Sequence, residues 1–474
     1  MSVRQAIIIA LGLTAASSNL SYAGGQDPAN KNTDPFADTS DPFANEADPF
    51  AQEQDPFAQE QAVNDEHDSN EFLDGKKHQS RVEIKSYYQN NEVRKPHALN
   101  PGLNLFNQYN RFVGLDMSLT SQWSENISTH GRLFSRYMAG SGLDSPDPQQ
   151  SAKKDHHSTH LLEGSLQWQN QSQDIAITVG RVKPTWSNGY NYDIANFLKP
   201  HGNLPYIDQD NPLQHKGWDM IQAQYFFDRF TLSGYLIESR LDENQNHNNI
   251  NHEAVIRLGY QDDHEFSLMI HKYDHGKASY AATFNTSVND NTTLRAEYTN
   301  EPQRRLAYYH ANYDTKNRYQ RFVIGTIYTS LDSWSLTAEL FYNQHGVGGQ
   351  QWQQLYNDAK HSAEQINTGQ SQDWGYDINQ ALNGINFLSQ GWTGKRYGSL
   401  MFSSAQSEDL WQLRLSTQVN LVDSSRLYRL EVLKSVNDNL SARLEYQRFS
   451  GCENCEYGLN PYEHNLRLTA SWLF

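Results

Sequence analysis

Residues 409–422 read DLWQLRLSTQVNLV, and residues 464–474 read HNLRLTASWLF. In both stretches apolar and polar side chains alternate with a period of two, which indicates a strand whose two faces meet different surroundings. The apolar face of the first stretch carries Trp411, Leu413, Leu415, Val419 and Leu421. The apolar face of the second carries Leu466, Leu468, Ala470, Trp472 and Phe474. These two stretches predict amphipathic strands.

The same alternation recurs upstream, from about residue 81. We expect about 18 such segments, at 81–90, 111–124, 127–141, 157–170, 173–186, 217–227, 229–240, 252–262, 264–275, 277–288, 292–302, 318–331, 333–346, 395–407, 409–422, 424–437, 439–451 and 464–474. Many are long enough for a tilted bilayer crossing of about 9–11 residues. Short and long connections alternate between them, which is typical of barrels that span an outer membrane. The sequence therefore predicts an all-β fold, a transmembrane antiparallel up-and-down barrel of about 18 strands, with 16 as the alternative count.

Five tryptophans support this arrangement independently. They would all lie at the end of the barrel with the short turns: Trp123, Trp168, Trp334, Trp411 and Trp472. Amphipathic indole rings concentrate where a membrane meets water. An even number of strands places both termini at this same end, which we expect to be periplasmic, with the long loops outside the cell.

Composition is consistent with a barrel and argues against helical spans. The formal net charge is -17, hydrophobic residues make up 37%, and the mean hydropathy is -0.79, yet the chain carries 27 Tyr, 20 Phe and 10 Trp. The sole long apolar run is 6–16, preceded by Arg4 and followed by Ser21-Tyr22-Ala23. That order is typical of a cleavable secretory signal peptide. We expect residues 1–23 to be the signal peptide and residues 79–474 to be the barrel.

Residues 24–78 form an acidic segment of different character. Asp-Pro-Phe-Ala recurs every seven residues, with its aromatic residues at Phe36, Phe43, Phe50 and Phe57. A Pro in each repeat excludes a continuous helix, and the polar, acidic composition predicts disorder. Three interpretations remain open: an array of motifs that binds a periplasmic protein, a mobile plug, or a solvated spacer.

The signal peptide, the alternating strands and the terminal Trp472-Leu473-Phe474 resemble bacterial outer-membrane porins over about residues 80–474. A count near 18 resembles alginate-export and specific-porin barrels. Gly180-Arg181 followed by Trp186 resembles a strand-to-loop feature of some large barrels. The resemblance implies an outer-membrane location, contact with lipid or lipopolysaccharide, and recognition of Phe474 by the barrel-assembly machinery.

The face opposite the apolar one would line the lumen. The charged residues that we expect to set its selectivity are Arg132, Arg136, Arg295, Arg414, Arg429, Arg443, Arg467, Glu163, Glu431 and Glu445. Asp116, Glu297 and Glu339 would share this face. Guanidinium groups suit anions, or sugars through planar hydrogen bonding. The alternative is that Arg and Glu simply pair across neighbouring strands and brace the wall.

Two of the predicted long loops carry candidate functional residues. Loop 187–216 contains Tyr190, Tyr192, Phe197, Tyr206, Asp208 and Asp210. It could fold inward as a constriction or lie on the surface. Cys452 and Cys455 fall in the last long loop, where a local disulfide is expected. No enzyme motif is present, and no metal, cofactor or nucleic-acid partner is predicted.

The predicted function is an outer-membrane channel for small polar solutes, anions or sugars. The alternative is an export or assembly component whose Asp-Pro-Phe segment docks a periplasmic partner. A scaffold that displays ligand-binding loops is a third possibility.

Overall fold

The computed structural model describes residues 77–94, 109–140, 156–187, 189–198, 216–240, 250–273, 277–302, 318–371, 373, 377, 393–405 and 411–474. The predicted signal peptide and the Asp-Pro-Phe repeats, with Phe36, Phe43, Phe50 and Phe57, lie outside these residues.

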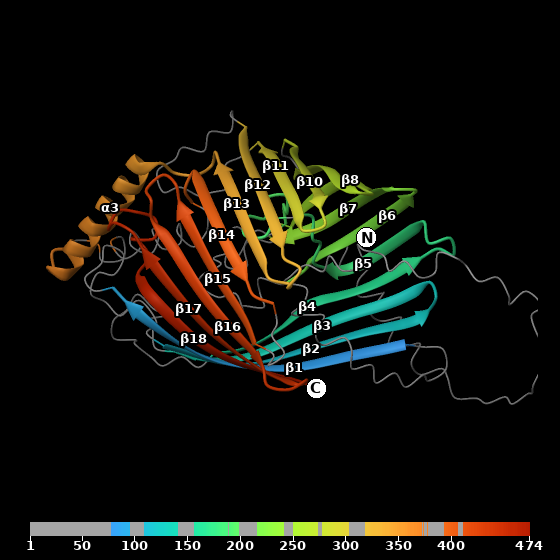
Figure 1. Ribbon diagram of the computed structural model, residues 1–474, viewed down its shortest axis with the longest axis horizontal. Helices are drawn as coiled ribbons and strands as arrows, with labels where there is room; N and C mark the ends of the chain where they lie inside the picture. The colour runs from blue at the N-terminus through green and yellow to red at the C-terminus, as the bar shows by residue number, and fades with distance from the viewer. Residues whose placement is uncertain are drawn as a thin grey trace, which may run out of the picture.

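Over the described ranges, 18 strands form one closed antiparallel sheet (Figure 1). The strands are β1 Lys77–Val93, β2 Tyr109–Ser124, β3 Ile127–Gly140, β4 His156–Gln169, β5 Ile175–Val182, β6 Trp218–Phe227, β7 Phe230–Arg240, β8 Ile250–Gln261, β9 His264–Tyr273, β10 Ser279–Asn289, β11 Thr292–Glu301, β12 Tyr319–Thr329, β13 Ser335–Asn343, β14 Arg396–Ser403, β15 Trp411–Asn420, β16 Arg426–Ser435, β17 Leu440–Ser450 and β18 Tyr462–Leu473. Each strand pairs with its neighbours in the chain, and β1 pairs with β18 to close the barrel. The predicted all-β barrel of 18 strands is confirmed, and the alternative count of 16 is wrong.

Alternation separates the two faces of the sheet. On β18, Leu466 and Leu468 are 43% and 55% exposed, whereas Arg467 and Thr469 are 4% and 3% exposed. The apolar side chains therefore point out of the barrel and the polar ones point in. Successive side chains of a strand point to opposite faces of the sheet, so the two faces of the barrel wall meet different surroundings. On several other strands the inward face also carries apolar side chains, among them Ile237, Val255 and Phe341, which are at most 3% exposed.

The connections define two rims. The links after even-numbered strands are short, and we call their end of the barrel the short-turn rim; the links after most odd-numbered strands are long, and their end is the long-loop rim. All five tryptophans of the predicted belt fall at the short-turn rim. Phe474 lies there too: its N–H donates to the carbonyl of Val82 at 2.8 Å, and its ring stacks on that of Trp472 at 5.6 Å.

The long-loop rim carries a helix, α3, Gly349–Asn367, which stands at the opposite end from the C-terminus (Figure 1). It lies between the expected strands 333–346 and 395–407, where no helix was predicted. Four buried residues follow a helical spacing within it: Trp352, Leu355, Ala359 and Ala363. Among the residues described, no helix is long and apolar enough to cross a membrane.

Strand β5 is shorter than expected, since it ends at Val182 and not near residue 186. Gly180 adopts a φ of +144°, and a Cβ at this position would lie 2.1 Å from the carbonyl oxygen of Gly164. Only glycine tolerates both the backbone angle and this close approach. Pro184, which follows, has no N–H to donate to a further ladder. The chain therefore leaves the sheet here and turns into the barrel.

Candidate functional site

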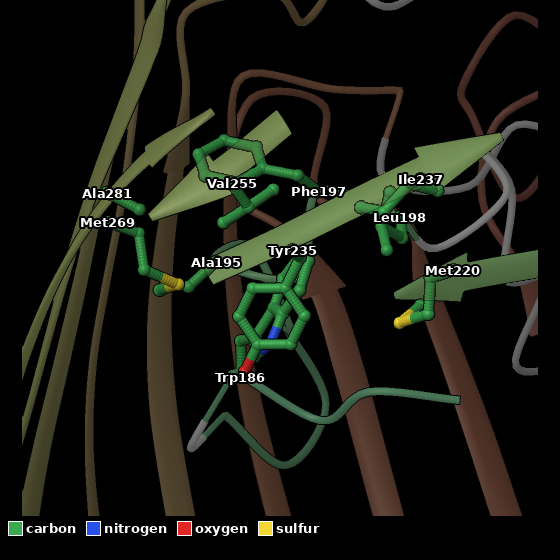
Figure 2. Packing of buried hydrophobic residues seen from close by; sticks show 10 residues of the cluster. All are labelled: Trp186, Ala195, Phe197, Leu198, Met220, Tyr235, Ile237, Val255, Met269 and Ala281. Carbon is green, nitrogen blue, oxygen red and sulfur yellow. The ribbon is translucent and has the colours of Figure 1, made fainter. Parts of the chain in front are cut away.

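The residues that follow β5 occupy the interior of the barrel. We call residues 183–198 the inward segment, of which residue 188 is not described. Its apolar side chains pack on inward-facing residues of β6 to β10, as Figure 2 shows. The cluster comprises Trp186, Ala195, Phe197 and Leu198 from the segment with Met220, Tyr235, Ile237, Val255, Met269 and Ala281 from the strands. The indole of Trp186 meets the ring of Tyr235 edge-on at 5.1 Å. The segment therefore contributes side chains to a buried hydrophobic cluster inside the barrel.

A second apolar cluster holds the middle of the inward segment further around the barrel. Tyr192 and Ile194 are fully buried among Val323, Phe341 and Tyr397 of β12, β13 and β14. The Tyr192 ring stacks on Phe341 at 4.9 Å. Burial raises the pKa of Tyr192 well above its usual value, so its hydroxyl stays neutral.

The Tyr192 hydroxyl also accepts a hydrogen bond from the side-chain amide of Gln418 on β15, at 2.9 Å. Together with the two clusters, this bond shows that the segment covers the inner wall from β6 to β15. We call that part the covered wall.

Two carboxylates of the covered wall bind the backbone of the segment. Glu297 on β11 accepts hydrogen bonds from Ser187 Oγ at 2.6 Å and from the N–H groups of Gly189, Ile194 and Ala195 at 2.8 to 3.1 Å. Both oxygens of its carboxylate are therefore used. Hydrogen bonds to a charged group contribute about 1.5–3 kcal/mol each. Glu297 alone thus holds three backbone N–H groups of the segment.

Glu339 on β13 does the same for the tip of the segment. Its two oxygens accept the N–H groups of Tyr190 and Asn191 at 2.9 and 2.8 Å. Buried backbone donors need a partner, and a segment that crosses a lumen cannot find one in a sheet. Glu297 and Glu339 lie on the inward face as predicted, but no local pattern around either residue indicates a partner more than 100 positions away.

Arginines complete the attachment. Arg321 Nη2 donates to the carbonyl of Ile194 at 3.1 Å, and Arg295 Nη2 donates to the hydroxyl of Tyr190 at 2.9 Å. The Arg295 guanidinium also lies 3.9 Å from the centre of the Tyr190 ring. Arg295 was expected among the selectivity residues of the lumen. It lies beneath the inward segment, on the covered wall, and its part in selectivity stays a prediction.

The remaining inner surface, on β16–β18 and β1–β4 with Arg414 of β15 at its edge, we call the open wall. Glu431 accepts Arg414 at 2.8 Å through one oxygen and Arg429 at 2.9 Å through the other. Arg429 also reaches Glu445 at 3.3 Å. These four side chains form a ladder across three strands, and Arg443 lies at an inward position of β17 nearby. The predicted lumen residues of this region are thus brought together.

A second ladder lies on β2 to β4. Arg132 donates to Asp116, with Nε at 3.0 Å from one carboxylate oxygen, and stands 3.9 Å from Glu163. Arg136 Nε donates to Ser158 Oγ at 3.0 Å. The expectation that Arg and acid pair across strands therefore describes Arg132, Arg414 and Arg429. Such pairs brace the wall and still set a field across the lumen.

An aromatic row on β1 to β3 adjoins the second ladder and was not predicted from the sequence. Tyr87, Phe112 and Phe134 occupy inward positions on β1, β2 and β3, and their rings stack at 4.7 and 5.9 Å. The Arg467 guanidinium lies 4.8 Å above Tyr87 and donates to Gln89 at 2.7 Å. The period-two pattern could have predicted the inward position of these rings, since all three fall on the polar face of their strands.

The last long loop is tied to the rim. Cys452 and Cys455 form a disulfide. The next residue, Glu456, is buried and accepts hydrogen bonds from Thr393, Tyr397 and Asn420 at 2.6 to 2.7 Å. Burial raises the pKa of Glu456 to about 7. This carboxyl ties the last long loop to the start of β14 and the end of β15, and no local sequence pattern points to it.

Of the aromatic residues predicted to form a constriction, Tyr190, Tyr192 and Phe197 lie inside the barrel. Tyr206, Asp208 and Asp210 lie outside the described residues. Within the ranges described, no three His, Cys, Asp or Glu side chains are grouped in a way that could hold a metal ion.

No family model and no curated protein matches the sequence. Several solved structures are similar in shape. OpdQ from Pseudomonas aeruginosa is 9% identical with a TM-score of 0.48, and the match covers 84% of this chain and 97% of OpdQ. OccAB3 from Acinetobacter baumannii is 9% identical with a TM-score of 0.47, covering 84% and 99%. OmpF from Salmonella typhi is 11% identical with a TM-score of 0.41, covering 85% and 99%.

Proposed function

We propose that this protein is an outer-membrane channel for small polar solutes, with anions and sugars as the favoured classes. The observation that carries the proposal is the sheet itself, which is closed, apolar outside and lined by charged side chains along the open wall. In lipid every backbone group must be paired, and closure of β1 on β18 meets that demand. A barrel of this strand number is wide enough for water inside.

The proposed path runs between the inward segment and the open wall. On one side the solute meets a segment whose polar backbone is already engaged by Glu297 and Glu339. On the other side it meets the ladders around Arg132 and Arg429. A guanidinium offers a planar pair of donors to a carboxylate, a phosphate or a sugar diol. Because these arginines are paired with carboxylates, we expect weak anion preference or none.

The difference between the two rims supports an orientation of the barrel in the membrane. We infer that the short-turn rim, with its tryptophans, is periplasmic and that the long loops and α3 face outward. Phe474 directly follows β18 and is 62% exposed, and we propose that the barrel-assembly machinery recognises it there. Both termini would then be periplasmic.

Single-channel recording in planar bilayers tests this function against the export alternative. The full chain and a variant that lacks residues 26–60 are compared. A channel predicts stepwise, ohmic current of similar size in both. A barrel that stays closed in both forms and conducts only with a periplasmic partner would overturn the proposal and favour export or assembly through the Asp-Pro-Phe segment.

A further inference from the structure

The last long loop joins β17 to β18 and contains the disulfide between Cys452 and Cys455. We call residues 452–457 the disulfide turn. Cys452 is exposed, whereas Cys455 is only 4% exposed, so a thiol in solution reaches the first cysteine more readily than the second. The turn then continues inward, because Glu456 and Tyr457 are both buried.

Two side-chain links run from the disulfide turn to the inward segment. In the first, the Tyr457 hydroxyl donates to the side-chain carbonyl of Gln418 at 2.8 Å, and the side-chain amide of Gln418 donates to the Tyr192 hydroxyl at 2.9 Å. In the second, the Tyr397 hydroxyl donates to Glu456 at 2.6 Å, and the Tyr397 ring lies 6.1 Å from the ring of Tyr192. Both links end on Tyr192, which is fully buried in the middle of the inward segment. Chains of packed and hydrogen-bonded side chains of this kind can carry energetic coupling between distant sites.

The loop is held to β1 on both sides of the disulfide turn. The guanidinium of Arg94, which follows β1, donates to the carbonyl of Phe449 at 2.7 Å and to that of Gly458 at 2.5 Å. Between these points the disulfide crosslinks the turn, and a disulfide restricts the conformations open to the chain that it closes. Reduction should therefore loosen the turn while the flanking parts of the loop stay in place.

The two residues between the cysteines contact α3. Glu453 accepts a hydrogen bond from the Tyr356 hydroxyl at 2.7 Å, and the side-chain amide of Asn454 donates to Gln353. The disulfide turn therefore has α3 on one side and the links to Tyr192 on the other. Only the links to Tyr192 lead to the inward segment, so the two sets of contacts are separable by substitution.

We propose that the disulfide turn is a thiol-sensitive latch: while Cys452 and Cys455 are joined it holds the inward segment in place through Tyr192, and reduction by an external dithiol releases the segment. This inference rests on the proposed function and names a regulation of the same lumen, since a released segment leaves a wider path for a solute.

The chemical step is thiol–disulfide exchange. A thiolate of the dithiol attacks Cys452 Sγ, the S–S bond breaks, and Cys455 Sγ leaves with the electron pair. The second thiolate of the reagent then attacks its own sulfur in the mixed disulfide, so that Cys452 Sγ leaves in turn. Both cysteines end as thiols that carry the protons of the reagent. The protein disulfide is reduced, and the dithiol is oxidised to a cyclic disulfide.

The test measures hydrogen exchange of residues 189–198 in the full-length protein, before and after treatment with dithiothreitol under native conditions. Alkylation and mass spectrometry count the thiols that the treatment exposes. We expect reduction to accelerate exchange in residues 189–198 by about tenfold, equivalent to about 1.4 kcal/mol in the free energy of local opening. The variant Cys452→Ser with Cys455→Ser should show the faster exchange without dithiothreitol and no response to it. Single-channel conductance should rise in parallel.

A matched pair of tyrosine variants tests the route while the disulfide stays intact. Tyr457→Phe removes the hydroxyl that bonds Gln418, and it should accelerate exchange in residues 189–198. Tyr356→Phe removes the hydroxyl that bonds Glu453 on the side of α3, and it should leave that exchange unchanged.

Three results would overturn the proposal. One is a disulfide that dithiothreitol does not reduce in the folded protein. Another is faster exchange confined to the disulfide turn, with residues 189–198 unchanged in the reduced protein and in the double serine variant. The third is an equal effect of Tyr457→Phe and Tyr356→Phe, which would show that the links to Tyr192 carry no specific coupling. Exchange and current are separate readouts, so thiol-dependent exchange in a barrel that does not conduct would contradict the proposed function and support the latch.

Discussion

The covered wall and the open wall belong to one sheet, yet they satisfy their buried charges in different ways. On the covered wall Glu297 and Glu339 accept backbone N–H groups from the inward segment. On the open wall Glu431 and Glu445 accept arginine side chains from neighbouring strands. The first arrangement fixes a piece of chain inside the barrel. The second leaves charged side chains facing whatever passes.

That difference assigns the two walls separate roles. A carboxylate that is filled by backbone donors has little capacity left for a solute, so the covered wall sets the width of the lumen. An arginine ladder keeps donors at the surface, so the open wall sets its preference. Changes on the covered wall should therefore alter conductance, and changes on the open wall should alter selectivity.

The largest effect is expected from releasing the inward segment. Replacing Glu297→Gln together with Glu339→Gln removes the charge from both acceptors, and leaves about 1–3 kcal/mol of unmet hydrogen bonding at each buried site. We expect single-channel conductance to rise about twofold or more, with larger current noise, because the segment no longer holds one position.

The matched control for this experiment is Glu265→Gln. Glu265 is a carboxylate of β9 that bonds Asn285 at 3.2 Å and makes no hydrogen bond to the inward segment. The single-channel conductance of the Glu265→Gln variant should equal that of the wild type. If the double variant also conducts like the wild type, the division of roles between the walls is wrong.

A smaller effect is expected from the open wall. Arg414→Gln with Arg429→Gln leaves Glu431 without its two ionic partners, so the reversal potential in a salt gradient should move toward cations while conductance changes little. A stranded buried carboxylate also destabilises a barrel. Adding Glu431→Gln removes one of the two uncompensated negative charges and should return the reversal potential part of the way to that of the wild type. An unchanged potential in the first variant would show that the solute path does not follow this ladder.

The smallest effect is expected in the pH dependence of local stability at the long-loop rim. Because burial raises the pKa of Glu456 from 4.5 to about 7, the folded state favours the protonated carboxyl. Its contribution to stability is full below about pH 4.5 and is lost as pH rises through about 7. Hydrogen exchange of residues 451–461 should be faster at about pH 8 than at about pH 5, after correction for intrinsic rates. Glu456→Gln should flatten this dependence, and equal protection in the wild type at both values would contradict it.

The strands of the barrel were predictable because the alternation of apolar and polar residues is visible within each short segment of sequence. Alternation in segments such as 409–422 reports which face of a strand meets apolar surroundings, and the turn spacing reports the hairpin order. The strand count and the inward positions of Arg132 and Arg414 follow from these patterns alone. The helix at Gly349–Asn367 has a local pattern as well, although its short apolar stripe was hidden inside a long polar loop.

The attachment of the inward segment was not predictable in the same way. Glu297 meets Ile194 across 103 positions, and no periodicity links the two. Gly180 and Pro184 mark where the chain leaves the sheet, but a glycine and a proline also end many surface hairpins. Aromatic residues such as Tyr192 suggested that the loop could fold inward. What decided between an inward and a surface position was the set of acceptors on distant strands.

The most direct test of the account is to place a bulky group on the inward segment and measure current. The two native cysteines are joined in a disulfide, so a Tyr190→Cys variant offers one reactive thiol. Leu232→Cys, on the outward face of β7, is the control. A water-soluble methanethiosulfonate reagent should reduce the single-channel conductance of Tyr190→Cys and leave that of Leu232→Cys unchanged. Complete modification of Tyr190→Cys without any change in current would contradict a solute path that runs past the inward segment.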